Sequence, residues 1–210
     1  MKDITIRKMG EECVAEASAA MSEAFLTESF TKKLVRVSLK SALPSVNIAF
    51  RLRMLSVINS GIPLVAACKG DTLTGAAMIT SAKAGRVPFH RSARMLAAFI
   101  YHLCRGFYCL RLSRIPGLIR MAWEPPDIPD DRMMLELIAV RPEYQGHGIG
   151  KRLLEAVRST CVERNASGVY LFTSDMKNRL LYERNGYRVI RTVENNGLAV
   201  YHMFLPEGRI

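Results

Sequence analysis

The stretch LELIAVRPEYQGHGIGKRLLEAV, residues 135–157, decides the fold of this chain. It starts inside the apolar run Met133–Val140, whose single charge is Glu136, and such a run predicts a buried strand that carries one carboxylate. From Gly148 to Val162, apolar side chains recur every four positions, which predicts an amphipathic helix. A glycine-rich turn that begins at Pro142 joins the two elements. The order is therefore strand, tight turn, helix.

The glycines of this turn suit an anion. Gly146, Gly148 and Gly150 have no Cβ, so the backbone can turn tightly and bring its amides close to a ligand. The first amides of a helix have no partner within the helix, and its N-terminus carries partial positive charge, so a phosphate is favoured there. Donor side chains flank the turn at Gln145, Lys151 and Arg152.

Two common phosphate-binding patterns do not fit the turn. A Walker loop requires GxxxxGK followed by Ser or Thr, whereas Lys151 is followed by Arg152, which has no hydroxyl group for magnesium. A dinucleotide-binding fold requires GxGxxG early in a βαβ unit, with an acid on the second strand. Here the glycines alternate as GxGxG, and the segment lies late in the chain.

The arrangement V-x-P-x-x-Q-G-x-G-I-G, which ends at Gly150, resembles the acyl-CoA pyrophosphate loop of the GNAT-type N-acetyltransferase superfamily. Downstream, YLFTSDMKNRLLYERNGYRVI, residues 170–190, is similar to the second motif of that superfamily, in which an Asn precedes a Leu-Tyr pair and a Gly-aromatic pair follows. The resemblance is specific over about residues 132–190, whereas residues 86–124 resemble nothing that we can assign.

The resemblance implies an α/β (α+β) fold with a mixed, mostly antiparallel central sheet flanked by helices. Its fourth and fifth strands, expected at Met133–Val140 and Val169–Thr173, would splay apart and receive the pantetheine arm of acetyl-CoA, the cosubstrate. Strand backbone would bind the pantetheine amides, loop amides would hold the pyrophosphate, and an Asn would reach the cofactor. The implied cofactor-binding residues are Ile138, Ala139, Val140, Gln145, Gly146, His147, Gly148, Ile149, Gly150, Lys151 and Asn178.

One position departs from the commonest form of the second motif. Many members carry Asn seven residues before the Tyr, where this chain has Asp175. Other members carry it four residues before, as Asn178 precedes Tyr182 here. The role of Asn178 is therefore implied less directly than that of the loop.

Acyl transfer to an amine needs a group that takes the amine proton, a donor to the thioester oxygen, and an acid for the leaving thiolate. The resemblance implies Tyr182 as the acid; the alternative is an aromatic side chain that packs under the last hairpin. Glu136 lies on the strand beside the reaction centre and could draw the amine proton through water, and the alternative is a structural carboxylate paired with an arginine. A backbone N–H near Val140 could polarise the thioester.

Outside these motifs, periodicity predicts one domain over residues 1–210 with a helical insertion of unknown role at residues 86–124, before the fourth strand. The remaining predicted elements are a strand (Ile4–Lys8), helices (Glu11–Phe25, Phe30–Leu39, Ser45–Ser60, Lys177–Arg184), a hairpin around Lys69-Gly70-Asp71 (residues 62–82), a basic helical stretch (Pro88–Ala122) and a closing hairpin (Tyr187–Val193 with Leu198–Leu205).

Composition bounds the class of protein. The 210 residues are 49% hydrophobic and 23% charged, which is typical of one soluble globular domain. The longest apolar run, Met95–Tyr101, is too short to span a bilayer, and acids among the first dozen residues argue against a secretory signal, so we expect a cytoplasmic protein. The five cysteines are scattered, which predicts free thiols and no metal site.

The net charge of +11 is concentrated in residues 29–123, which hold fifteen bases and a single acid, Asp71. Such a field could attract the phosphates of a cofactor, an acidic acceptor, a membrane surface or nucleic acid. No groove-reading motif is present, so we expect no specific nucleic-acid partner. The basic helical stretch could wall a substrate pocket, lie on a membrane, or form core helices with an arginine-rich outer face.

The function predicted from these observations is an N-acetyltransferase that transfers an acetyl group from acetyl-CoA to a primary amine, small or peptidic, by direct attack in a ternary complex. The alternative is a non-catalytic domain that binds or senses acyl-CoA. A homodimer is compatible with both of these functions.

Overall fold

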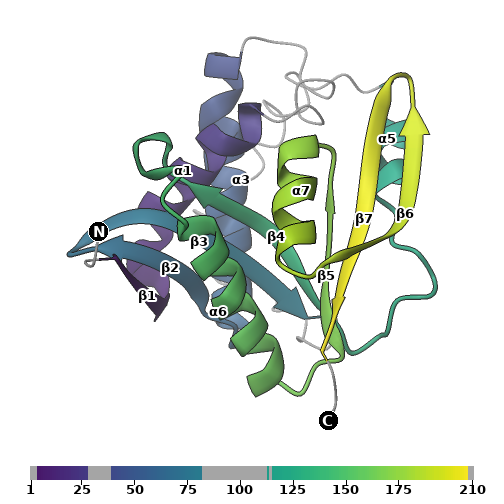
Figure 1. Cartoon of the computed structure of the whole chain (residues 1–210). Helices are drawn as coiled ribbons and strands as arrows, with labels where there is room; N and C mark the ends of the chain where they lie inside the picture. The colour runs from purple at the N-terminus through teal and green to yellow at the C-terminus, as the bar shows by residue number, and fades with distance from the viewer. Residues whose placement is uncertain (1–3, 28–38, 82–112, 114, 208–210) are drawn as a thin grey trace.

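The computed structural model describes residues 4–27, 39–81, 113 and 115–207. They form one seven-stranded sheet in the order β1-β2-β3-β4-β5-β7-β6, with helices on both faces (Figure 1). The β4–β5 pair is parallel and the other neighbouring strands are antiparallel. The mixed, mostly antiparallel sheet expected from the sequence is therefore confirmed.

The first half of the sheet is its most buried part. β1 (Ile4–Met9) pairs with β2 (Leu64–Lys69), which forms the predicted hairpin with β3 (Thr72–Ser81). The hairpin turns at Gly70, whose φ of +58° is readily adopted by glycine. Helices cover both faces here, so the side chains of β2 and β3 are buried along most of their length.

Two helices lie behind the sheet in Figure 1. A 3₁₀ turn, Glu11–Cys13, leads into α1 (Val14–Thr27), which packs against α3 (Leu39–Asn59). We predicted that the second of these helices starts at Ser45, and this is wrong, because the helix runs through Pro44. Because Pro44 has no N–H, α3 lacks one backbone hydrogen bond there. Packing of the helix in the folded protein offsets this local cost. The predicted helix Phe30–Leu39 lies outside the described residues, apart from Leu39, which opens α3.

The opposite face carries α6 (Ile149–Glu163) and α7 (Met176–Arg184), drawn in green in Figure 1. The predicted apolar face of α6 packs into the main core through Ile149, Leu153 and Val157. β4 (Met133–Val140) precedes α6, and β5 (Gly168–Thr173) lies between the two helices in the chain. The strand–turn–helix unit predicted from the sequence is therefore present.

The chain closes with β6 (Arg188–Asn195) and β7 (Leu198–Pro206), and β7 inserts between β5 and β6. Asn196 and Gly197 both have positive φ, +49° and +68°, as a type I′ turn requires. The predicted closing hairpin is confirmed, and β6 forms one edge of the sheet.

The described part of the predicted insertion is Ser113 and residues 115–124, which include α5 (Ile115–Ala122). This helix lies behind β6 and β7 in Figure 1. Leu118 and Met121 form a second core cluster with Leu198 and Val200 of β7. Residues 86–112 and 114 of the insertion, with most of the basic helical stretch, lie outside the described residues.

A buried chain of hydrogen bonds fixes α5 on the sheet. The His202 ring is fully buried, its Nε2 lies 2.9 Å from the carbonyl oxygen of Met121, and its Nδ1 lies 2.7 Å from the Tyr170 hydroxyl. Because a carbonyl can only accept, Nε2–H donates to Met121 and Nδ1 accepts from Tyr170. Burial lowers the pKa of His202, so the ring is neutral at neutral pH.

This arrangement predicts acid sensitivity. A histidine whose pKa is lower in the folded than in the unfolded chain stabilises the fold above its unfolded value, about 6.5, and that stability is lost as pH falls below it. We expect the unfolding free energy, measured with urea, to decrease between pH 7.5 and 5.5. His202→Leu leaves two buried groups unpaired and is expected to cost about 2–4 kcal/mol at pH 7.5 and less at pH 5.5. An equal cost at both pH values would contradict the prediction; His147→Gln, which alters an exposed imidazole, is the control.

The described cysteines behave as buried free thiols. Cys13, Cys68 and Cys161 are unpaired and buried, and burial raises the pKa of Cys13 and of Cys161 to about 11. These thiols therefore stay protonated and unreactive at neutral pH. Within the described ranges, no helix combines the length and the hydropathy needed to cross a bilayer.

Candidate active site

A cleft opens between β4 and β5 because the two strands pair only where they start. The parallel register contains Met133 opposite Val169 and Met134 opposite Tyr170, and no later pair. From Leu135 onward, β4 has a partner on its β3 side alone. The predicted splay between the fourth and fifth strands is therefore confirmed.

Backbone groups of β4 face this cleft. The N–H of Arg141 donates to the carbonyl of Thr74 at 2.9 Å, so this residue faces away from the cleft, toward the strand of β3. Because backbone groups alternate along a strand, Ala139 faces the same way, while Ile138 and Val140 face the side that β5 has left. Ile138 thus presents its N–H and carbonyl to whatever occupies the cleft, and Val140 presents its N–H, while its carbonyl accepts from the Gln145 side chain.

The burial of β4 differs from our prediction of a fully buried strand. Met133, Leu135 and Ala139 are buried, whereas the other five residues of β4, Val140 among them, are only partly buried. The apolar run could not reveal this, because the exposure comes from the divergence of β5 and not from the residues of β4. The strand is an apolar wall with one open side.

The glycine-rich loop leads from this wall into α6. Gly146 and Gly148 have φ of +76° and +74°, in the left-handed region that disfavours other residues. Nothing lies within 4 Å of where a Cβ would stand at either position, so backbone conformation, and not crowding, requires glycine here. The side chain of Gln145 donates to the carbonyl of Val140 at 3.0 Å and ties the loop to the end of β4.

The N-terminus of α6 has no side-chain cap. Gly148 is the N-cap residue and has no side chain to accept from the first amides, those of Ile149, Gly150 and Lys151. The loop residues Gln145 to Gly148 are exposed, His147 among them. Unsatisfied amides at the positive end of a helix, on an exposed loop, are the donor set that binds phosphate groups.

Glu136 is held by two neighbours. Its Oε2 accepts from Nε of Arg53, on α3, at 3.0 Å, and its Oε1 accepts from Nη2 of Arg53 and from Thr80 Oγ1 at 2.8 Å. The β3–β4 register skips Glu136, which is therefore the extra residue of a β-bulge. A carboxylate offers about four acceptor sites, so room for about one more donor remains. The bidentate hydrogen bond raises the pKa of Arg53 and secures the pair.

Tyr182 lies on α7 and is 5% exposed. Its ring packs at a tilt against that of Tyr187, with centroids 5.6 Å apart, and both belong to the main core. Gly150 of α6 lies near the same helix, since a Cβ there would be 3.6 Å from Leu181. The helix that carries Tyr182 thus borders the start of α6, where the uncapped amides lie.

Comparison with protein families decides what this site belongs to. Residues 105–189, which contain the cleft strands, the loop, α6 and α7, match the family model described as the acetyltransferase (GNAT) domain. This part of the chain is therefore similar to a GNAT acetyltransferase domain. The resemblance noted in the sequence is confirmed.

Solved structures share the fold of this chain at low sequence identity. An acetyltransferase from Corynebacterium glutamicum, described as histone acetyltransferase HPA2 and related acetyltransferase, has a TM-score of 0.65 and 14% identity, with 98% of each chain covered. PaiA N-acetyltransferase from Thermoplasma acidophilum, solved with coenzyme A, has a TM-score of 0.60 and 14% identity over 97% of this chain and 99% of that one. YncA from Salmonella typhimurium, a putative acetyltransferase solved with acetyl-CoA, has a TM-score of 0.54 and 14% identity over 97% of this chain and 93% of that one. Curated protein sequences gave no match.

Asp175 has a structural role, at the position where many GNAT members carry Asn. Its Oδ1 accepts from the amides of Lys177 and Asn178 at 2.8 and 3.1 Å, so it is the N-cap of α7. Asn178 lies in the first turn of α7 with its side chain exposed. The departure from the motif is thus a capping residue, and Asn178 is accessible from solvent.

Sequence analysis missed two residues of the candidate site, Arg53 and Thr80. Both lie outside the motifs, and Arg53 is separated from Glu136 by 83 positions. Alternation could have placed Thr80 on a strand, but no spacing pairs it with a carboxylate on another strand. Among the residues that the structure describes, no group of three His, Cys, Asp or Glu side chains could hold a metal ion.

Proposed function

We propose that this protein is an N-acetyltransferase that transfers an acetyl group from acetyl-CoA to a primary amine by direct attack in a ternary complex. The observation that carries the proposal is the uncapped, glycine-led start of α6 beside the free backbone of β4. Two of the structural neighbours were solved with coenzyme A or acetyl-CoA, which supports the choice of cosubstrate.

In this proposal the cofactor follows the cleft. The backbone of Ile138, Ala139 and Val140 lies alongside the pantetheine arm, with Ile138 and Val140 in hydrogen-bonding orientation. The amides from Gln145 to Lys151 hold the pyrophosphate, and Asn178 contacts the cofactor near its amide end. The first amides of α6 have no side-chain cap, so the pyrophosphate would meet donors that no capping side chain occupies.

The chemistry assigns one proton to each of two side chains. Acetyl-CoA supplies the thioester, whose carbonyl carbon bonds to the amine nitrogen while the bond to sulfur breaks. Glu136 takes the proton that the amine loses, through a water on its remaining acceptor site. Tyr182 gives its phenolic proton to the departing thiolate, and the N–H of Val140 donates to the carbonyl oxygen.

Thiol release from acetyl-CoA tests the proposal. A panel of polyamines, aminoglycosides, amino acids and peptides would be screened at several pH values. Amine-dependent release, with an acetylated amine seen by mass spectrometry, is the expected result. Release of thiol without an acetylated amine, or no release with any amine, would contradict the assignment.

The second candidate is a domain that binds acyl-CoA without turnover. The hydrogen bonds that Glu136 already accepts favour this candidate. The Glu136 carboxylate is already paired with a guanidinium and a hydroxyl group, which suits a structural role. Calorimetry with CoA separates the candidates, because a sensor binds CoA tightly yet gives no thiol release.

Glu136→Gln tests the base directly. The amide keeps the size of the side chain but cannot take a proton, so we expect turnover to fall about 100-fold while CoA affinity changes little. Glu136 is 19% exposed and Arg53 48% exposed, so solvent screens the pair and the stability cost should stay within about 1 kcal/mol. Glu163→Gln, which removes a remote ion pair with Lys8, is the control. Unchanged turnover would assign Glu136 a structural role.

The proposal also covers the acceptor, the binding partners and the cellular compartment. The acceptor is a small-molecule or peptidic amine, no specific nucleic acid is bound, and the expected compartment is the cytoplasm. A homodimer is open and is tested by sedimentation. The basic segment, residues 29–123, would attract the phosphates of the cofactor or an acidic acceptor.

A further inference from the structure

The sequence contains two Asn-Gly pairs, Asn185-Gly186 and Asn196-Gly197, and the structure places them in different surroundings. An asparagine that precedes glycine is chemically labile, because glycine has no side chain to hinder attack by its backbone nitrogen on the asparagine carboxamide. The attack requires an accessible carboxamide, a backbone N–H that is not held in a hydrogen bond, and a backbone that can rotate. The two pairs differ in these respects.

The first pair is held in place at the end of α7. The carboxamide of Asn185 donates to the carbonyl of Leu181 at 2.8 Å. The N–H of Gly186 donates to the carbonyl of Glu183 at 3.0 Å. Asn185 is also partly buried. Because both reacting groups are engaged, two hydrogen bonds must break before the attack can begin.

The second pair forms the tip of the β6–β7 hairpin. Both residues are exposed, with φ of +49° at Asn196 and +68° at Gly197. The ladder of the hairpin ends at the pair Asn195–Leu198, so the N–H of Gly197 lies outside it. Exposed loop tips open at less cost than paired strands, which gives this backbone freedom to rotate.

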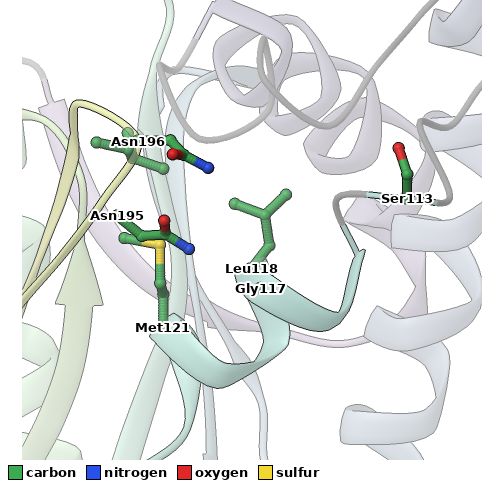
Figure 2. A pocket seen from close by; sticks show the side chains of 7 residues that line it. Ser113, Gly117, Leu118, Met121, Asn195 and Asn196 are labelled. Atoms are coloured by element: carbon green, nitrogen blue, oxygen red, sulfur yellow. The ribbon is translucent and has the colours of Figure 1, made fainter.

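The tip of the hairpin lies beside α5. Figure 2 shows the carboxamides of Asn195 and Asn196 on the side of the hairpin and Leu118 on the side of the helix. A Cβ at Gly117 of α5 would stand 3.3 Å from the side-chain nitrogen of Asn195. Just behind the turn, Leu198 packs with α5 in the second core cluster. A change in the backbone of the turn would therefore reach α5.

We infer that Asn196 is a site of spontaneous deamidation that changes the backbone of the hairpin tip, whereas Asn185 is protected. The nitrogen of Gly197 bonds to the side-chain carbonyl carbon of Asn196. The bond from that carbon to its amide nitrogen breaks, and ammonia leaves with the proton of the N–H. Water then opens the resulting succinimide ring at either carbonyl, which yields aspartate or isoaspartate. Water is the only co-reactant.

Isoaspartate alters the turn more than aspartate does. In isoaspartate the main chain runs through the side-chain carbonyl carbon, so one extra carbon atom enters a two-residue turn whose two positive φ angles match the twist of the strands. Either product also adds a carboxylate beside α5, where the side chains that line the space between the turn and the helix carry no formal charge. The contact between the hairpin and α5 is therefore expected to weaken.

Peptide mapping of the intact protein tests the inference. The protein is incubated in mildly alkaline buffer and digested, and mass spectrometry follows the exchange of NH₂ for OH in each Asn-Gly peptide. We expect Asn196 to convert about 10- to 100-fold faster than Asn185, since only the latter must first lose two hydrogen bonds. In urea, which removes both hydrogen bonds, the two rates should converge. Equal rates in the folded protein, or no conversion of Asn196, would overturn the inference.

Asn196→Gly is the matched control. Gly-Gly is favoured in type I′ turns, so the variant keeps the hairpin but has no carboxamide to lose. After the same incubation, the urea midpoint of the wild type is expected to fall as isoaspartate accumulates, and that of Asn196→Gly to stay constant. A constant wild-type midpoint would overturn the expected weakening of the contact with α5. Neither measurement uses acetyl-CoA, so the result is independent of the proposed function.

Discussion

A Gly148→Val protein is expected to bind CoA at least 100-fold more weakly than the wild type. Gly148 has φ of +74°, and a β-branched residue resists that conformation by about 1–2 kcal/mol. The loop relieves the strain by rotating the peptide units that lead into α6, which turns the amides of Ile149 and Gly150 away from the pyrophosphate. Each charge-assisted hydrogen bond lost costs about 1.5–3 kcal/mol, so the loss of two is enough for the expected effect.

Gly61→Val is the matched control for this prediction. Gly61 follows α3, has φ of +80°, and likewise has nothing within 4 Å of the position of a Cβ. The two substitutions therefore introduce the same strain in equally open surroundings, one at the loop and one remote from it. Calorimetry with CoA should show weak binding for Gly148→Val and wild-type binding for Gly61→Val. Tight binding by Gly148→Val would show that the loop does not hold the pyrophosphate.

The second large effect is expected for Tyr182→Phe. The substitution removes one hydroxyl group and keeps the ring that packs against Tyr187, so the fold should persist. If the phenol protonates the thiolate, turnover falls about 100-fold, because a positioned general acid contributes about 10²–10⁴-fold. CoA affinity should stay within about twofold of the wild-type value, since the proton is needed only as the bond to sulfur breaks.

Tyr187→Phe is the paired control. The Tyr187 hydroxyl is buried and has no hydrogen-bond partner among the described residues, so its removal leaves no group unsatisfied. Burial also raises the pKa of Tyr187, which keeps it a poor proton donor. Turnover by thiol release should therefore fall for Tyr182→Phe and not for Tyr187→Phe. An equal effect of the two variants would indicate that packing of the aromatic pair, and not proton transfer, is what matters.

Local chemistry made a large part of this protein predictable. The period of apolar residues located α6 to within a residue, and the Asn196-Gly197 and Gly70 turns located both hairpins. Gly148 was expected to support a tight turn, and its left-handed backbone does so. These features depend on residues within a few positions of one another, so the sequence suffices to predict them. Pro44 is the counterexample, because packing of α3 on α1 overrides its local preference.

Other features exist only because distant segments meet. The apolar run of β4 does not encode the loss of β5 as a partner, which leaves Ile138 and Val140 without a strand neighbour on that side. Glu136 receives Arg53 from 83 positions away, and His202 holds the carbonyl of Met121 from 81 positions away.

The sequence by itself determined the strand–turn–helix unit and its glycine-led loop, since backbone sterics and hydrophobic periodicity act over a few residues. The tertiary structure alone decided the opening of the cleft, the partners of Glu136 and the buried hydrogen bonds of His202. Those depend on which strands diverge and on which buried polar groups pair, and such pairing is set by the fold as a whole.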